Sequence, residues 1–232
     1  RLHMRAPPRL PLLTYLTAIR FDAPRSPDAA VTRRFLLSAC AALAAWPTRL
    51  PVSTAAGTPE ATAVFAVDSS ELDSRSYRGL QLPNGLRVLL CSAPEASTAA
   101  ASMDVQVGSL NNPPEWPGLA HFCEHMLFLG TERYPDEGEF ERFISKNGGS
   151  KNAFTASENT NFYFDVGGAA LPGALARFAD FFAAPLFSAS GASREVNAID
   201  AEHSKNLQSD VWRADAVLRL RARREHPYAR FA

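Results

Sequence analysis

The feature that most restricts how this chain can fold is a histidine pair, four residues apart, in an apolar segment. The segment runs from Leu119 to Leu129 and contains His121, Glu124 and His125. On a helix, positions i and i+4 lie on one face, with their Cβ atoms about 5–6 Å apart. We therefore predict a helix over this segment, with both imidazoles on the same face. A glycine follows the segment directly, as is common at the C-terminal end of a helix.

The residue types on this face suit a metal ion. His121 and His125 could bind one tetrahedral ion through nitrogen atoms at about 2.0–2.1 Å. Glu124 would border the same face without being a ligand, and could accept a proton from ion-bound water, whose pKa zinc brings down to about 7. Two buried imidazoles and a carboxylate without partners would cost several kcal/mol, a cost that an ion removes. The pattern predicts one Zn²⁺ per chain; structural core histidines are the alternative.

A third ligand would have to come from elsewhere in the chain. Catalytic zinc takes three protein ligands and keeps one position open. Glu195 and Glu202 lie seven residues apart, which is two turns along one face of a further expected helix. One of them could bind the ion while the other holds a ligand histidine or the water. The spacing does not choose between Glu195, Glu202 and His203, and a pair of exposed carboxylates is the alternative.

The remaining pattern predicts strands and helices that come in clusters. Alternating apolar residues on both sides of Pro83-Asn84-Gly85 indicate a hairpin. Further strands are expected over residues 101–108, 151–155 and 159–166, the last two as an antiparallel pair. Further helices are expected over residues 136–146, around 175–182, and from Ser193 as N-cap through 206. The predicted fold is α+β and two-layered, with helices packed on one face of a mostly antiparallel sheet.

The first part of the chain differs from the rest. Residues 1–21 hold four arginines and no acidic side chain, and Arg33-Arg34 precedes an apolar run of 12 residues, Phe35–Trp46. This arrangement resembles a targeting segment; a disordered, compositionally biased extension is the alternative. We assign residues 1–68 to a mostly disordered N-terminal extension and 69–232 to the folded domain. The protein is expected to be soluble, and cytoplasmic or organellar if the extension is a leader.

Composition excludes several other classes. Lys plus Arg and Asp plus Glu number 24 each, whereas a nucleic-acid-binding protein needs a basic surplus. Three cysteines without a CxxC spacing indicate neither a disulfide framework nor a cysteine zinc knuckle. No apolar stretch approaches the roughly 18 residues of a membrane span.

These residues resemble one family, the insulinase or pitrilysin (M16-type) inverted zinc metallopeptidases. The resemblance runs from about residue 77 to 231, and is firmest over residues 118–166 and 194–206. Residues 121–131, 152–155 and 161–165 are similar to the insulin-degrading-enzyme branch in particular. The family pattern places a ligand glutamate after 76 intervening residues, which from His125 leads to Glu202.

The resemblance implies a complete site. His121, His125 and Glu202 would bind zinc, Glu124 would be the general base, and Glu195 would support the site from behind. Asn152, Ala153 and Phe154 match the edge strand on which family members align a peptide, although Phe154 could equally be a core aromatic. Cys123 is expected to point away from the ligand face.

The implied activity is that of a zinc metalloendopeptidase that hydrolyses peptides or small unfolded proteins. The alternatives are a non-catalytic core or scaffold subunit of the same fold and an inactive fragment. Family members close their site with a second half, so the 69–232 domain is expected to be truncated at its C-terminus. It would need a C-terminal half or a partner subunit to hold a substrate.

Overall fold

A twisted seven-stranded sheet forms one layer of the part of the chain that the computed structural model describes, residues 15–21 and 63–229. Its strands are β1 (Tyr15–Phe21), β2 (Ala63–Phe65), β3 (Ser76–Gln81), β4 (Arg87–Ser92), β5 (Thr98–Val105), β6 (Lys151–Thr155) and β7 (Thr160–Gly167). Their spatial order is β2-β3-β4-β1-β5-β7-β6. Strand β1 is parallel to β5 and antiparallel to β4, and the other neighbours are antiparallel. The sheet is therefore mostly antiparallel, as predicted, and β6 lies at one edge.

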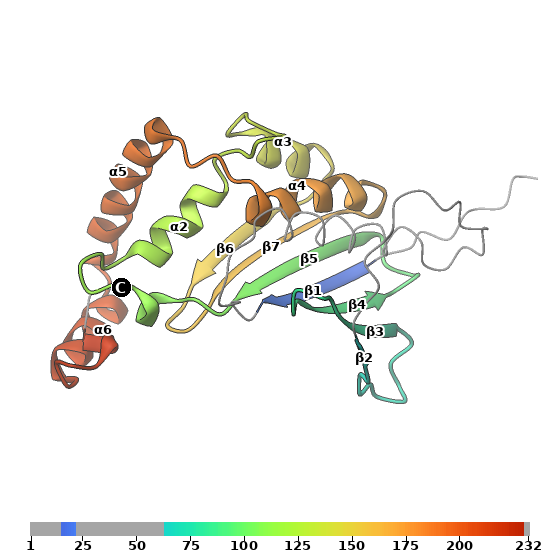
Figure 1. Ribbon diagram of the computed structural model, residues 1–232, viewed down its shortest axis with the longest axis horizontal. Coiled ribbons are helices and arrows are strands. Elements are labelled where there is room, and N and C mark those ends of the chain that lie inside the picture. Colours follow the sequence, from blue (N-terminus) through green and yellow to red (C-terminus); the bar gives the residue numbers. More distant parts are fainter. Residues whose placement is uncertain (1–14, 22–62, 230–232) are drawn as a thin grey trace, which may run out of the picture.

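Five α-helices make up the second part of the described structure: α2 (Leu119–Leu127), α3 (Glu139–Lys146), α4 (Leu171–Ala183), α5 (Ala189–Asn206) and α6 (Asp210–Arg221). Short 3₁₀ turns occur at η1 (Ser109–Asn111), η2 (Gly168–Ala170) and η3 (Pro227–Ala229). Helices α3 and α4 cover one face of the sheet, α2 contacts its β6 and β7 end, and α5 packs on the outer side of α2 (Figure 1). The predicted α+β class is confirmed.

The core lies between the sheet and helices α2 to α4. Strand β7 buries every second side chain, Phe162, Phe164 and Val166 among them, as expected of a strand with one covered face. Phe178 of α4 meets Phe164 with ring centroids 5.2 Å apart in an edge-to-face arrangement. Each such fully buried side chain contributes about 1.5–3 kcal/mol through apolar burial. This core holds α2 against the end of the sheet, where its Leu127 is buried.

Several predicted element boundaries need correction, among them the end of α2 at Leu127 instead of Leu129. Helix α5 begins earlier than expected, because Ser188 and not Ser193 is its N-cap, and the Ser188 hydroxyl accepts a hydrogen bond from the Gly191 N–H at 3.1 Å. Helix α3 begins at Glu139 because the Asp136 carboxylate instead accepts from the Gly138 N–H in a turn. The strand expected over residues 101–108 is β5, which lies three residues earlier.

The boundary expected between residues 68 and 69 stays a prediction, but two strands of the sheet lie before it. Strands β1 and β2 both lie within residues 1–68, the segment expected to be an extension, and both are part of the sheet. The β1 sequence YLTAIRF contains β-branched and aromatic residues, which suit a strand. The run Phe35–Trp46, interpreted as a targeting signal, lies outside the described residues. Over the described part of the chain, no helix is both long and apolar enough to cross a membrane.

Candidate metal centre

Helix α2 presents the histidine pair, and its first turn is built by local chemistry. It begins after Gly118, whose φ of 88° lies in the left-handed region that glycine adopts without strain. The buried Asn112 side chain accepts a hydrogen bond from the Ala120 N–H at 2.9 Å, which satisfies one of the free donors at the start of the helix. Met126 and Leu127 anchor the opposite face of α2 in the interior. The histidine face is thereby turned outward from the core.

Two imidazoles and one carboxylate converge beside α2. The Nε2 atoms of His121 and His125 lie 3.3 Å apart, and each lies 3.7 Å from Oε2 of Glu202 on α5. Around a tetrahedral zinc with bonds of 2.0–2.1 Å, ligand atoms would be about 3.3–3.4 Å apart. Among the described residues, this is the one group of three or more such side chains close enough to hold an ion. The donor set and its separations therefore fit zinc.

The structure separates the three candidates for the third ligand. Glu202 reaches the Nε2 side of both histidines, whereas Glu195 accepts a hydrogen bond from Nδ1 of His125 at 2.8 Å. A carboxylate on Nδ1 favours the tautomer whose Nε2 lone pair is free for an ion. His203 lines the adjacent cleft but is not a member of the converging group. Glu202 therefore lies on the Nε2 side of both imidazoles, whereas Glu195 lies on the Nδ1 side of His125.

Glu124 lies next to the histidines without joining their cluster. Its side chain is buried, with 8% of the residue exposed. Its Oε2 accepts a short hydrogen bond of 2.6 Å from the hydroxyl of Thr155, the last residue of β6. A nearly buried carboxylate facing a cleft that also holds two imidazoles is in a suitable place to exchange a proton with a bound water.

A cleft of about 710 Å³ joins this group to the edge of the sheet. Its walls are α2, strand β6 with the turn after it, and helices α5 and α6. Asn152, Ala153 and Phe154 all line it. Phe154 is 48% exposed, so the alternative that it is a core aromatic is wrong. Sequence reasoning assigned no role to Thr155, Trp212 or Arg219, which also line the cleft, because only the packing of α6 and β6 around α2 brings them there.

The chain also matches a known protein family. The insulinase family (peptidase family M16) matches residues 87–223, which is more than half of the chain. The chain belongs to this family.

Relatives in the insulinase family are much longer than this chain. Insulin-degrading enzyme of Mus musculus is 53% identical over 159 residues, which is 68% of this chain and 16% of that protein. The A-factor-processing enzyme of Saccharomyces cerevisiae is 49% identical over 162 residues, 70% of this chain and 16% of that protein. The crystal structure of pitrilysin matches with a TM-score of 0.70 and 37% identity, over 73% of this chain and 18% of that one. The chain thus spans about a sixth of the length of the curated relatives it matches.

Cys123, which lies inside the insulinase-family motif, takes no part in the cluster. Its side chain is a free thiol, it is exposed, and it is not among the residues that line the cleft. The prediction that it points away from the ligand face is consistent with both observations.

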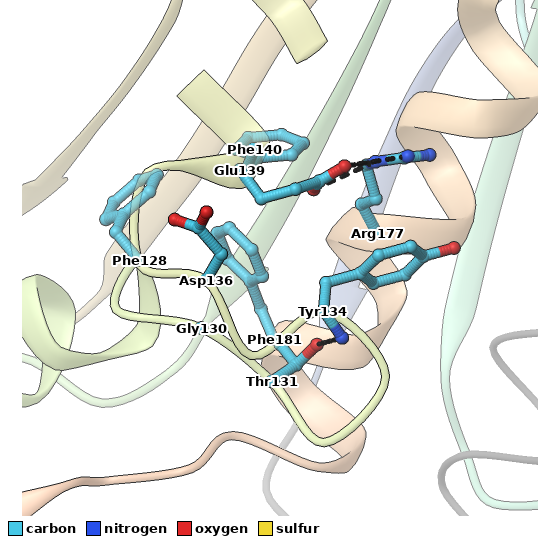
Figure 2. Close-up of a pocket in the computed structure, with 9 residues that line it drawn as sticks. All are labelled: Phe128, Gly130, Thr131, Tyr134, Asp136, Glu139, Phe140, Arg177 and Phe181. Carbon is cyan, nitrogen blue, oxygen red and sulfur yellow. Dashed lines mark hydrogen bonds and ion pairs between the residues drawn. The ribbon is translucent and has the colours of Figure 1, made fainter. Parts of the chain in front are cut away.

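A second, much smaller cavity of about 10 Å³ lies between α3, α4 and the loop that precedes α3. Figure 2 shows its lining, in which the Arg177 guanidinium faces the Glu139 carboxylate, with Nε donating to Oε1 at 2.8 Å. The same guanidinium lies over the Tyr134 ring at 4.5 Å from its centroid. This volume is about what a single water molecule needs, so the cavity is a small packing gap and is too small to be a substrate site.

Proposed function

We propose that this chain forms the zinc-binding part of a metalloendopeptidase that hydrolyses peptides or small unfolded proteins. The observation that carries the proposal is the convergence of His121, His125 and Glu202 within 3.3–3.7 Å, beside a buried Glu124. In this proposal the first three residues hold one Zn²⁺ and Glu195 orients His125. Membership of a peptidase family supports the proposal.

Each residue would have a defined task. Zinc, when bound, supplies a Lewis acid that polarises a carbonyl and acidifies water. Glu124 would accept a proton from the attacking water and return it to the leaving nitrogen of the cleaved peptide bond. Since Oε2 of Glu124 is engaged by Thr155, its Oε1 would carry this proton. Glu195 would keep Nδ1 of His125 protonated, and therefore its Nε2 free for the ion.

The substrate would lie along strand β6. Within the described residues β6 pairs with β7 alone, so its second edge is available for an extended peptide. Pairing of main chains aligns a peptide with little regard for its side chains. Asn152, Ala153 and Phe154 would provide this edge, with the Phe154 ring beside the bound chain.

The isolated 232-residue chain is expected to bind zinc but to turn over peptides slowly. The cleft is bordered on one side by α5 and α6, which bury little of their surface, so a substrate would remain accessible to water there. A C-terminal half or a partner subunit would close it. A scaffold role is the alternative, and the intact set of two histidines and two glutamates speaks against it, because a scaffold has no need of a proton-accepting carboxylate.

The decisive test combines metal analysis with cleavage of a quenched-fluorescent peptide in the full-length protein. Glu124→Gln keeps the shape of the side chain but cannot accept the proton, so zinc should stay stoichiometric while kcat falls by about 10²–10⁴-fold. His125→Ala should lose both zinc and turnover. Turnover in Glu124→Gln at the wild-type rate, or a wild-type protein that cleaves peptides equally well after chelation, would refute the proposal.

A further inference from the structure

Thr155 is the residue through which the edge strand contacts the buried carboxylate of Glu124. It is the last residue of β6, and its hydroxyl donates to Glu124 Oε2 at 2.6 Å. Over the described residues, this is the one hydrogen bond that the structure records for the Glu124 side chain. The bond is short because the acceptor is a carboxylate.

The direction of this hydrogen bond follows from the neighbouring threonine. Thr160 lies opposite Thr155 across the β6–β7 pair, with the two hydroxyl oxygens 3.4 Å apart. The Thr160 hydroxyl donates to the carbonyl oxygen of Val107 at 2.8 Å, so its proton is already used. The Thr155 proton is therefore directed to Glu124.

Glu124 needs such a partner to keep one orientation. The terminal torsion of a glutamate side chain has a broad, roughly two-fold energy profile, so an unrestrained carboxylate samples many orientations. Threonine is well suited to restrain it, because branching at Cβ limits its own χ1 angle. With Oε2 held by Thr155, Oε1 is the oxygen left for a water in the cleft.

We propose that Thr155 is a positioning residue that ties the orientation of the Glu124 carboxylate to the strand on which a peptide would be aligned. This inference rests on the proposed function. Thr155 directly follows the three residues expected to pair with the peptide, and alternation along β6 turns its side chain to the α2 side while Asn152 and Phe154 face outward. Strand β6 would thus position both the scissile bond of the peptide and the Glu124 carboxylate that accepts the proton.

The kinetic test uses the zinc-loaded full-length protein and a quenched-fluorescent peptide. Thr155→Val keeps the shape and removes the hydroxyl, and should lower kcat by about tenfold to a hundredfold, the loss typical of a misplaced reacting group. The value of KM should stay within about twofold and zinc should stay stoichiometric, since neither the edge strand nor the ligands change. Thr155→Ser should recover most of kcat.

Thr160→Val is the matched control for stability. It removes a hydroxyl that lies 3.4 Å from that of Thr155 and donates to the Val107 carbonyl oxygen rather than to Glu124. The Val107 carbonyl oxygen then loses that donor. It should lower Tm at least as much as Thr155→Val does, while kcat stays within about twofold of wild type. If Thr155→Val keeps the wild-type kcat, or if Thr160→Val loses kcat to the same degree, Thr155 has a structural role only and the inference is wrong.

A crystallographic comparison separates this inference from the proposed function. In Thr155→Val the Glu124 carboxylate should rotate or occupy two conformers, while α2 and β6 stay in place. An unchanged single conformer would overturn the inference even with an active enzyme. A wild-type protein without zinc-dependent cleavage would instead refute the proposed function, and the conformation of Glu124 would still decide whether Thr155 orients it.

Discussion

Helices α2 and α5 supply the two halves of the candidate site, and they are held in very different ways. Helix α2 buries Glu124, Met126 and Leu127 and contacts both β6 and β7. Helix α5 is twice as long, 18 residues against 9, but its one buried residue is Gly191, and α6 buries none. In Figure 1, α5 stands outside α2 and away from the sheet.

Three contacts within residues 191–195 attach the N-terminal half of α5 to its described neighbours. The absence of a side chain at Gly191 allows the backbone of α5 to approach Leu129, because a Cβ there would lie 3.0 Å from Leu129 Cδ1. Arg194 forms an ion pair with Glu137, and Glu195 bonds His125. The histidine pair is therefore preorganised by the core, whereas Glu202 depends on the docking of α5. Because metal binding is coupled to folding, an ion bound to Glu202 and the histidines would stabilise the docking of α5 on α2.

The largest expected effect comes from the half of the site that the core holds. His125→Ala removes a ligand nitrogen that cannot be replaced from the rigid α2, so stoichiometric zinc should be lost, as measured by metal analysis after dialysis. His203→Ala is the matched control, because His203 lines the cleft outside the converging group and its loss should leave one zinc per chain. Zinc lost equally in both variants would contradict the ligand assignment.

The difference in packing should appear directly in stability. Ile144 of α3 is fully buried in the core, so Ile144→Ala should lower the free energy of unfolding by about 2–5 kcal/mol in urea denaturation. Val211 of α6 is 78% exposed, and Val211→Ala should change the free energy of unfolding by less than about 0.5 kcal/mol. A large loss in Val211→Ala would show that α6 is more tightly coupled to the core than its exposure indicates.

A smaller effect is expected at the contact between the two helices. Glu195→Ala removes the acceptor that orients His125, and zinc affinity should fall by about 10–100-fold in competition with a chelator. Asp200→Ala, on an exposed position of the same helix, is the control and should leave the affinity unchanged. Equal affinities in the two variants would mean that α2 holds His125 without help from α5.

The smallest effect is expected at Cys123. Its exposed thiol lies inside the motif but outside the cleft, so Cys123→Ala should keep stoichiometric zinc and change the affinity by less than about twofold. This variant tests whether a residue contributes to zinc binding because it lies within the sequence motif or because it lies on the histidine face of α2. Loss of zinc would show that the face assignment of α2 is wrong.

Elements defined by neighbours in the chain could be predicted from sequence. The β3–β4 hairpin follows from alternation on both sides of Pro83-Asn84-Gly85, and the structure pairs Leu80 with Val88 there as a hairpin requires. Strand β1 could not be predicted, because its place between β4 and β5 depends on partners more than 60 residues away. The start of α5 was also misplaced, because Ser188 and Ser193 are equivalent as N-caps by residue type alone.

By itself the sequence determined the histidine face of α2, since helical periodicity places His121 and His125 together wherever that helix lies. It also determined the family, through residues that are neighbours in the chain. Residue spacing left Glu195, Glu202 and His203 open and only the resemblance pointed to Glu202, whereas the tertiary structure brings Glu202 to those nitrogen atoms. The tertiary structure alone decided that Thr155 meets Glu124. The physical reason is that periodicity fixes angles within one helix, whereas the approach of α5 and β6 to α2 is set by packing between elements that are far apart in the chain.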